Sequence, residues 1–240
     1  MKFETVNIFP TTIYVGKMED HDRHKEEFYK VYTKFDYPQV KLNKQGNIKT
    51  INTISENEGN PLIHLEDSLA PLFAEISRHA KSYCQEVLRL KDVFDIVFTK
   101  SWISRSRESD HEIPWHIHST SHISFVYYLN IPENSHILEF SNENSPNAFF
   151  KSLFFDDPSG EEYNIVEEFT QTNAEIFGLT PFEGNLVLFP SKIPHCTKSA
   201  CEYFKGERLA IVGDITLVLK EEYLSYSYGY INEKYWKKFV

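Results

Sequence analysis

The feature that most constrains the fold of this chain is a change of sequence pattern near residue 93. From there to residue 219, short runs rich in β-branched and aromatic residues alternate with turn residues, which is typical of β-strands. Before it, apolar residues recur at helical spacing. Helices followed by strands predict an α+β protein that is mainly β, a sheet sandwich with helices on one side. The strand-like runs are 95–106, 122–132, 136–142, 185–191 and 208–219.

The first 92 residues predict one strand and two helices. Residues 7–15 are rich in β-branched side chains and predict a short strand. A mostly charged helix is expected at about Asp20 to Phe35, and a clearer amphipathic one from near Glu66. Asp67 or Ser68 could cap the second helix, because short polar side chains accept hydrogen bonds from the free N–H groups of a first turn.

The length of 240 residues suits one domain, 1–240, with a sizeable core. We expect a strand and supporting helices over 1–92, a β core over 93–219 and a tyrosine-rich tail over 220–240. The stretch 141–183 interrupts the strand rhythm with loop-like and apolar segments. Long insertions in compact domains are often functional, and the apolar content here favours a lid over a site.

Composition argues against several classes of protein. The formal net charge of −10 argues against nucleic-acid binding, which requires clustered Lys and Arg. The three cysteines form no CxxC pair, and a domain of this size needs no disulfide. No apolar segment reaches membrane-spanning length, and the amino terminus carries no leader pattern. A cytoplasmic location without membrane contact is therefore expected.

A histidine pair, His116 and His118, follows the first strand-like run of the core. Residues i and i+2 of a strand point to the same face, so both imidazoles could reach one ion. A third histidine, His195, follows the run NLVLF, and neutral imidazole suits iron, copper, nickel and zinc. An HxH pair is a weak signal by itself, because two half-buried histidines at a strand end would look the same.

Three further motifs are similar to those of prolyl-hydroxylase-like 2-oxoglutarate/Fe(II) oxygenases. The run SFVYYLN at 124–130 resembles the strand that follows the first metal motif of that family. FEGNLVLFPS at 182–191, followed by His195, resembles its glycine turn, strand and distal metal histidine. ERLAI at 207–211 resembles the strand that carries its arginine. The opening IFPTTIYV and the stretch WHIHSTSHISFVYYL are closer still to a bacterial and phage group of these oxygenases.

The resemblance implies a fold, two cofactors and a role for each motif residue. The fold is a double-stranded β-helix of the jelly-roll or cupin-like kind, with the three histidines holding Fe(II). Arg208 would bind the C5 carboxylate of 2-oxoglutarate, which a planar guanidinium suits. The Tyr128 hydroxyl would donate to the same carboxylate, and Ser124 would lie on the same strand face.

The activity that the resemblance implies couples the dioxygen-dependent decarboxylation of 2-oxoglutarate to oxidation of a second substrate. We expect hydroxylation of an unactivated C–H bond in a small metabolite, an amino acid or a peptide. Desaturation and other oxidative outcomes start from the same chemistry. The substrate is set by the site and its loops and does not follow from the fold.

One candidate ligand departs from the family pattern. The first motif of the family is HxD or HxE, and His118 stands at the acidic position. Three neutral imidazoles would leave the ion with a net charge of about +2, against about +1 with one carboxylate ligand. Glu139 is an alternative source of a carboxylate, although the two-residue spacing favours His118.

Other residues are candidates for contact with the substrate or with a second subunit. Arg105 and Arg107 alternate on the strand before the histidine pair, and would hold a substrate anion if they point inward. Trp115 could line the pocket. The tail 220–240 could cover the pocket or contact another chain, so a homodimer is one expectation.

Two other classes stay open from the residues themselves. A cupin-like dioxygenase with three histidines would not use 2-oxoglutarate and would not need Arg208. A non-enzymatic jelly-roll module would bind no metal. Metal analysis separates the second class from both oxygenases, and the effect of Arg208→Ala separates the first.

Overall fold

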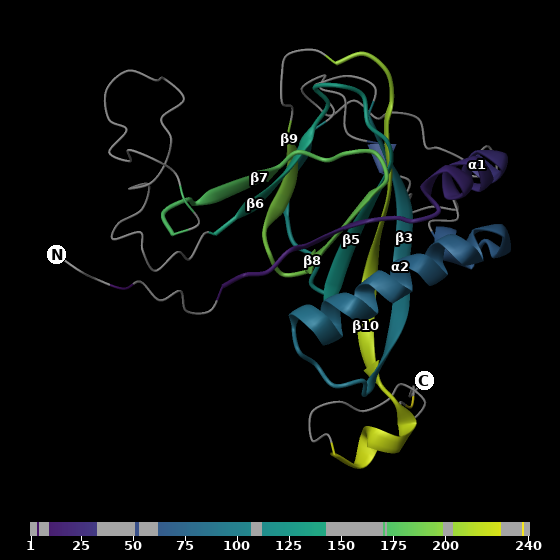
Figure 1. The fold of residues 1–240 in the computed structure, drawn as a ribbon, viewed down its shortest axis with the longest axis vertical. Helices are drawn as coiled ribbons and strands as arrows, with labels where there is room; N and C mark the ends of the chain where they lie inside the picture. The colour runs from purple at the N-terminus through teal and green to yellow at the C-terminus, as the bar shows by residue number, and fades with distance from the viewer. Residues whose placement is uncertain are drawn as a thin grey trace.

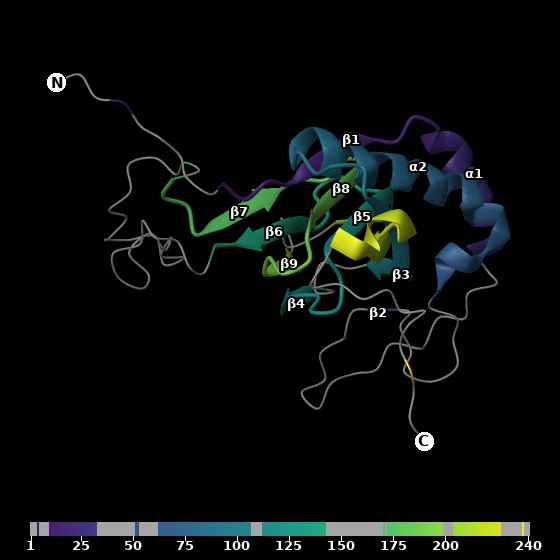
Figure 2. The same cartoon turned by 90° about the horizontal axis from the view of Figure 1, so that it is seen from below.

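The computed structural model describes residues 4, 10–32, 51–52, 62–106, 112–142, 170, 172–198, 204–226 and 237. These residues form two antiparallel sheets that face each other, with two helices on the outer face of the larger sheet (Figures 1 and 2).

The two sheets have the topology of a double-stranded β-helix. The six-stranded sheet has the order β1-β8-β5-β10-β3-β2 and the four-stranded sheet the order β4-β9-β6-β7. Successive strands from β3 to β10 lie alternately in the larger and the smaller sheet, except that β6 and β7 both lie in the smaller one. The expected double-stranded β-helix requires this alternation. The larger sheet comprises β1 (Tyr14–Lys17), β8 (Asn185–Pro190), β5 (Ile123–Asn130), β10 (Arg208–Leu219), β3 (Phe94–Ser106) and β2 (Ile51–Asn52). The smaller comprises β4 (Ile113–His116), β9 (His195–Lys198), β6 (Ile137–Ser141) and β7 (Ile176–Leu179).

Strand β5 shows how the larger sheet positions the site. Its residues are buried on both faces, so the sequence is a continuous apolar run instead of an alternating one. Phe125 and Tyr127 pack in the outer core, beneath the helices. Val126 and Tyr128 pack in the inner core, against Phe140 of the smaller sheet and its neighbours. The space between the sheets is therefore lined by alternate residues of each strand.

Helices α1 (His21–Tyr32) and α2 (Ala70–Ser82) cover the outer face of the larger sheet (Figure 2). A buried contact joins them: Nε2 of His24 lies 2.6 Å from Oε2 of Glu75, and the Glu19 N–H donates to the other carboxylate oxygen. Both side chains are almost fully buried. Because a buried charge needs such partners, this contact fixes how the helices pack together.

The start of α2 differs from the prediction. Two 3₁₀ turns, Ile63–Leu65 and Asp67–Leu69, precede it, and a π-helical turn, Tyr83–Val87, follows it. The N-cap residue is Leu69, which makes no side-chain cap hydrogen bond, so the prediction of a cap at Asp67 or Ser68 was wrong. The Ser68 hydroxyl donates to the Glu66 carboxylate instead.

Several predicted segments are described only in part. Strand β1 begins at Tyr14, later than expected, and residues 5–9 lie outside the described residues. Within the predicted lid, 141–183, residues 176–179 form β7 at the edge of the smaller sheet, while 143–169 lie outside the described residues. The tail begins with a 3₁₀ segment, Glu221–Tyr226, and most of the rest is not described.

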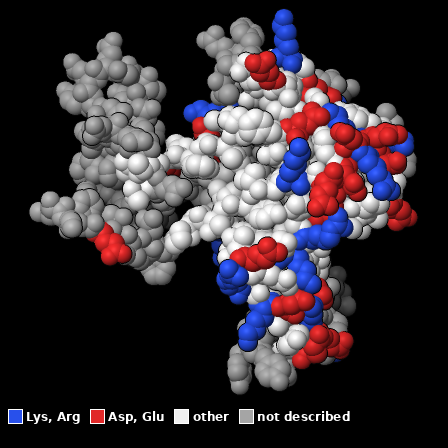
Figure 3. Space-filling model, viewed as in Figure 1, with Lys and Arg blue, Asp and Glu red and all other residues white. Residues whose placement is uncertain are grey.

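Two features bear on what the chain can contact: the distribution of charged side chains on its surface and the length and apolar character of its helices. On the face shown in Figure 3, acidic and basic side chains are interspersed around the helices, and the centre is mostly uncharged. Among the described residues, no helix combines the length and apolar character that crossing a membrane requires.

Candidate functional site

The structure brings the three predicted histidines together. His116, His118 and His195 each offer one ring nitrogen, and these three atoms lie within 4.8 Å of one another. His116 ends β4 and His195 begins β9, and they are register partners across the two strands. The ring centroids of His116 and His195 are 4.2 Å apart, and each lies 5.2 Å from that of His118. Such a group can hold one metal ion.

His118 reaches this position differently from its neighbour. It lies beyond the end of β4, so strand alternation does not place it beside His116. Its backbone N–H instead donates to the carbonyl oxygen of Ser191 at 2.8 Å. The ring of Trp102, an inward-facing residue of β3, lies 5.7 Å from the His118 ring and limits where it can turn.

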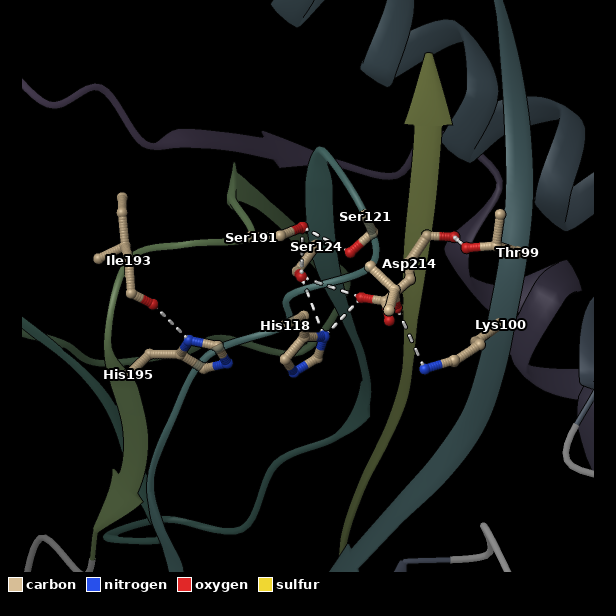
Figure 4. A network of polar contacts seen from close by, with 10 residues as sticks. Thr99, Lys100, His118, Ser121, Ser124, Ser191, Ile193, His195 and Asp214 are labelled. Atoms are coloured by element: carbon tan, nitrogen blue, oxygen red, sulfur yellow. Dashed lines mark hydrogen bonds and ion pairs between the residues drawn. The ribbon is translucent and has the colours of Figure 1, made fainter. Parts of the chain in front are cut away.

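All three rings have their Nδ1 atoms occupied, two of them by main-chain carbonyls. His116 and His195 each donate from Nδ1 to the carbonyl oxygen two residues earlier, both at 2.8 Å. Nδ1 of His118 lies 2.5 Å from Oδ1 of Asp214 (Figure 4). Carbonyl and carboxylate oxygens accept hydrogen bonds, so each Nδ1 carries the proton and each Nε2 keeps its lone pair.

Electrostatics keep the ligand atoms in the form that binds metal. Burial lowers the pKa of His195 to about 3 and also lowers the pKa of His116, so both imidazoles are neutral at physiological pH. Burial alone would raise the pKa of Asp214, but hydrogen bonds from His118 and Ser124 outweigh it and lower that pKa. The site therefore combines three imidazoles, two of which burial keeps neutral, with one carboxylate behind them, a donor set that fits Fe(II).

A buried hydroxyl network supports the His118 side of the site. The Ser124 hydroxyl lies 3.1 Å from Nδ1 of His118 and 3.0 Å from Oδ1 of Asp214. It is also hydrogen-bonded to the hydroxyl of Ser191, which contacts Ser121 (Figure 4). Ser124, predicted to lie with the 2-oxoglutarate residues, thus contacts the histidine side of the site.

Arg208 and Tyr128 form a second polar group between the sheets. Arg208 is 2% exposed, and its Cζ lies 5.3 Å from the centroid of the Tyr128 ring. Its Nη1 lies 3.5 Å from the Ser104 hydroxyl, and no acidic side chain among the described residues pairs with it. The Arg208 Nε and the Tyr128 hydroxyl are both buried without a hydrogen-bond partner in the described part of the chain. A buried cation with free donors is a site for a carboxylate.

Arg105 does not face the site. Its register partner, Leu209, packs in the outer core, and its guanidinium contacts Tyr32 of α1 at 3.2 Å and Glu207 at 3.6 Å. Of the two alternatives for Arg105, an inward clamp for a substrate anion and an outward charge, the structure therefore favours the outward one. Arg107 lies outside the described residues.

Two other candidates also lie away from the metal ligands. Trp115 is 43% exposed and precedes His116 on β4, so the pleat directs it to the other face. Glu139 alternates with Phe140, which packs in the inner core, and its carboxylate contacts the Cys196 thiol at 3.5 Å. The geometry thus favours His118 over Glu139 as the third ligand.

Asp214 is the residue that sequence reasoning missed. It lies 96 positions from His118, so no local pattern links the two residues. The available signal was that Asp214 is the one charged residue within the apolar run 209–219. A carboxylate inside a buried strand requires a partner.

Comparison with known proteins agrees with this geometry. Residues 100–213 match the model of a family described as "Putative 2OG-Fe(II) oxygenase". The matched segment contains the three histidines, Tyr128 and Arg208. No curated protein matches the sequence.

Solved structures of low sequence identity share the fold. A 2OG-Fe(II) oxygenase family oxidoreductase from Burkholderia pseudomallei is 10% identical with a TM-score of 0.51, over 85% of this chain and 84% of that chain. AviO1 from Streptomyces viridochromogenes is 11% identical with a TM-score of 0.50, over 86% and 90%. A prolyl-4-hydroxylase from Pseudomonas putida is 13% identical with a TM-score of 0.48, over 86% and 92%. The first two matches support the double-stranded β-helix assignment.

Proposed function

We propose that this chain is a 2-oxoglutarate/Fe(II) oxygenase, because residues 100–213 match the model of the family described as "Putative 2OG-Fe(II) oxygenase". His116, His118 and His195 hold Fe(II), and Arg208 with Tyr128 holds 2-oxoglutarate. The observation that carries this assignment is that three ring nitrogens, one from each histidine, lie within 4.8 Å of one another, while each ring is fixed by a hydrogen bond at Nδ1.

The histidines bind the metal without a proton to lose. Burial keeps His195 and His116 neutral, and their Nδ1 hydrogen bonds prevent the rings from turning away. The rings of Phe189 and Phe140 lie 4.7 Å and 6.4 Å from the His195 ring. These apolar neighbours exclude water from one side of the metal site, which strengthens electrostatic interactions there.

Arg208 and Tyr128 supply donors for the C5 carboxylate of 2-oxoglutarate. The free Nε of Arg208 and the free Tyr128 hydroxyl are the kind of group that a carboxylate accepts from. Burial raises the pKa of the Tyr128 hydroxyl, which therefore keeps its proton to donate. The Arg208 guanidinium is buried and has no acidic partner in the part of the chain that the structure describes, so it gains most from an anionic ligand, which supplies the missing charge.

The bound iron and 2-oxoglutarate together supply the oxidising chemistry, in which dioxygen converts 2-oxoglutarate to succinate and CO2 and one oxygen atom goes to the second substrate. We assign to this chain the hydroxylation of an unactivated C–H bond. The substrate class is a small metabolite, an amino acid or a peptide.

The direct test is turnover of 2-oxoglutarate. Protein loaded anaerobically with Fe(II) and 2-oxoglutarate is mixed with oxygenated buffer, and succinate is measured with amino acids and peptides added in turn. We expect succinate from the wild-type protein and none from His195→Ala or Arg208→Met. Arg105→Met is the matched control, because Arg105 lies on the other face of the same sheet, and it should keep the wild-type rate. Equal turnover by Arg208→Met and Arg105→Met would contradict the assignment.

A second function is favoured by one observation, the absence of a carboxylate among the three clustered ligands. Three-histidine iron sites are compatible with direct dioxygenation of a ring or thiol without 2-oxoglutarate. In that case oxygen uptake would not depend on 2-oxoglutarate, and Arg208→Met would leave it unchanged. Oxygen uptake with and without 2-oxoglutarate separates the two functions.

A further inference from the structure

The three histidines are supported unequally. Two of them donate from Nδ1 to a main-chain carbonyl within their own turn, which is a neutral and local partner. The third, His118, meets the carboxylate of Asp214 on a strand 96 residues away. The histidine at the position that is acidic in the family is therefore the one with a carboxylate behind its ring.

Asp214 is held in place by the fold. It is 1% exposed, and its Cα is the register partner of Ser124 on one side and of Lys100 on the other. The register between β10 and β3 shifts directly after it, and such irregularities redirect side chains near functional sites. Its Oδ1 accepts hydrogen bonds from both His118 and Ser124.

Asp214 lies behind the metal ligands rather than among them. The group of nitrogens within 4.8 Å of one another consists of the three histidines and does not include its carboxylate. A carboxylate that accepts from Nδ1 orients the ring and raises the basicity of Nε2, and its negative charge acts through the ring on the bound metal. The negative charge that the three histidines lack is thus supplied by Asp214, which contacts the ring of His118 from behind.

We propose that Asp214 is a positioning residue that replaces the missing carboxylate ligand, by holding Nε2 of His118 toward the metal and placing a negative charge behind its ring. This inference rests on the proposed metal site. The inference goes beyond that site because it assigns part of the metal affinity to Asp214, a residue that does not touch the metal.

The first experiment is titration of the metal-free protein with Co(II) alone, followed by its visible absorption, which reports coordination geometry. Asp214→Asn keeps the size of the side chain and an oxygen acceptor but removes the charge. We expect it to weaken Co(II) binding by about 10- to 100-fold, the usual effect of losing such a partner. Ser124→Ala is the matched control: it removes a neutral hydroxyl that contacts both Nδ1 of His118 and Oδ1 of Asp214 but leaves the charge of Asp214 in place, and we expect it to weaken binding by less than about threefold.

The second experiment places a carboxylate among the ligands themselves. His118→Asp restores the acidic ligand of the family and removes the ring through which Asp214 acts. Asp214→Asn in this background should therefore change Co(II) binding by less than about threefold, against about 10- to 100-fold in the wild type. A purely structural role predicts that Asp214→Asn weakens binding by the same factor in both backgrounds. Should His118→Asp fail to fold, judged by its thermal melt, His118→Glu takes its place.

The outcomes separate this inference from the proposed function. If the wild-type protein binds no Co(II), or if His195→Ala leaves binding unchanged, the metal site itself is wrong. If the wild type binds Co(II) through His195 but Asp214→Asn binds as tightly, the site stands and the role of Asp214 is overturned. The same holds if Asp214→Asn weakens binding by the same factor in both backgrounds.

Discussion

Replacing Arg208 with methionine should change folding stability and 2-oxoglutarate binding in opposite directions. In the ligand-free protein the guanidinium is 2% exposed and has no acidic partner among the described residues. Burial lowers its pKa, which expresses the cost of keeping the charge there. An apolar side chain of similar length removes that cost. The ligand-free variant should therefore be more stable than the wild type.

The expected magnitudes follow from the burial. Replacing a buried charge by an apolar side chain is neutral or stabilising by about 1–4 kcal/mol, and we expect about 1–2 kcal/mol here because Ser104 partly compensates Arg208. That raises Tm by about 2–8 °C in a chain of this size. Loss of the guanidinium should weaken 2-oxoglutarate binding by about 10²- to 10³-fold, or about 3–4 kcal/mol.

The assay is a thermal melt of metal-loaded protein without oxygen, with and without 2-oxoglutarate. At about 100 times the wild-type Kd, the ligand should stabilise the wild type by about 2.7 kcal/mol and Arg208→Met by no more than about 0.4 kcal/mol. Arg208→Lys keeps the charge and should show weak binding without the gain in stability. Arg105→Met should keep the full ligand response. A ligand-free Arg208→Met protein that melts below the wild type would refute the reasoning, because the charge would then be paired.

Three further predictions concern the framework. Gly213→Ala should lower the free energy of unfolding by about 1–3 kcal/mol, because the added Cβ would lie 2.5 Å from the Lys100 carbonyl oxygen. The variant should therefore show a lower Tm, and an unchanged Tm would contradict the close packing of the two strands. Burial alone would raise the pKa of Glu75, but hydrogen bonds from His24 and the Glu19 N–H outweigh it and lower that pKa below 4.5. The ionised Glu75 carboxylate therefore stabilises the fold above pH 4.5, and this contribution is lost as pH falls further. Glu75→Gln should thus be about 1–3 kcal/mol less stable than the wild type at pH 7, with the gap closing below pH 4.5 in melts across pH; a gap independent of pH would contradict this. Burial raises the pKa of Cys196 to about 12, so iodoacetamide at pH 8 should leave this thiol unmodified in the native protein and modify it after unfolding. Peptide mapping measures both, and rapid modification of the native protein would contradict the buried position of Cys196.

Local sequence patterns were sufficient for the scaffold and for most of the site. The β-rich runs became strands of two sheets because β-branched and aromatic residues suit a pleated, buried surface. His116 and His195 could be found because short-range motifs surround each of them. The lack of a side-chain cap on α2 could not be foreseen, because the preceding 3₁₀ turns form the first hydrogen bonds of that segment.

Other parts of the site depend on contacts between distant residues. Which face Arg105 takes is set by the register of β3 against β10, and a shift of one residue would reverse it. The partnership of Asp214 and His118 joins a strand to a loop far away in the sequence, so neither local pattern contains it. Sequence therefore identified the three histidines that the structure brings together, and the tertiary structure was needed to identify what supports them.

The most direct test of the central claim is an anaerobic titration of the metal-free protein with Fe(II) in the presence of 2-oxoglutarate. Bound 2-oxoglutarate would give the iron site a weak visible charge-transfer band. We predict a band that saturates at about one iron per chain and is absent from His195→Ala and Arg208→Met. The control variant Arg105→Met should keep the band. Iron that binds through His195 without producing this band would contradict the account.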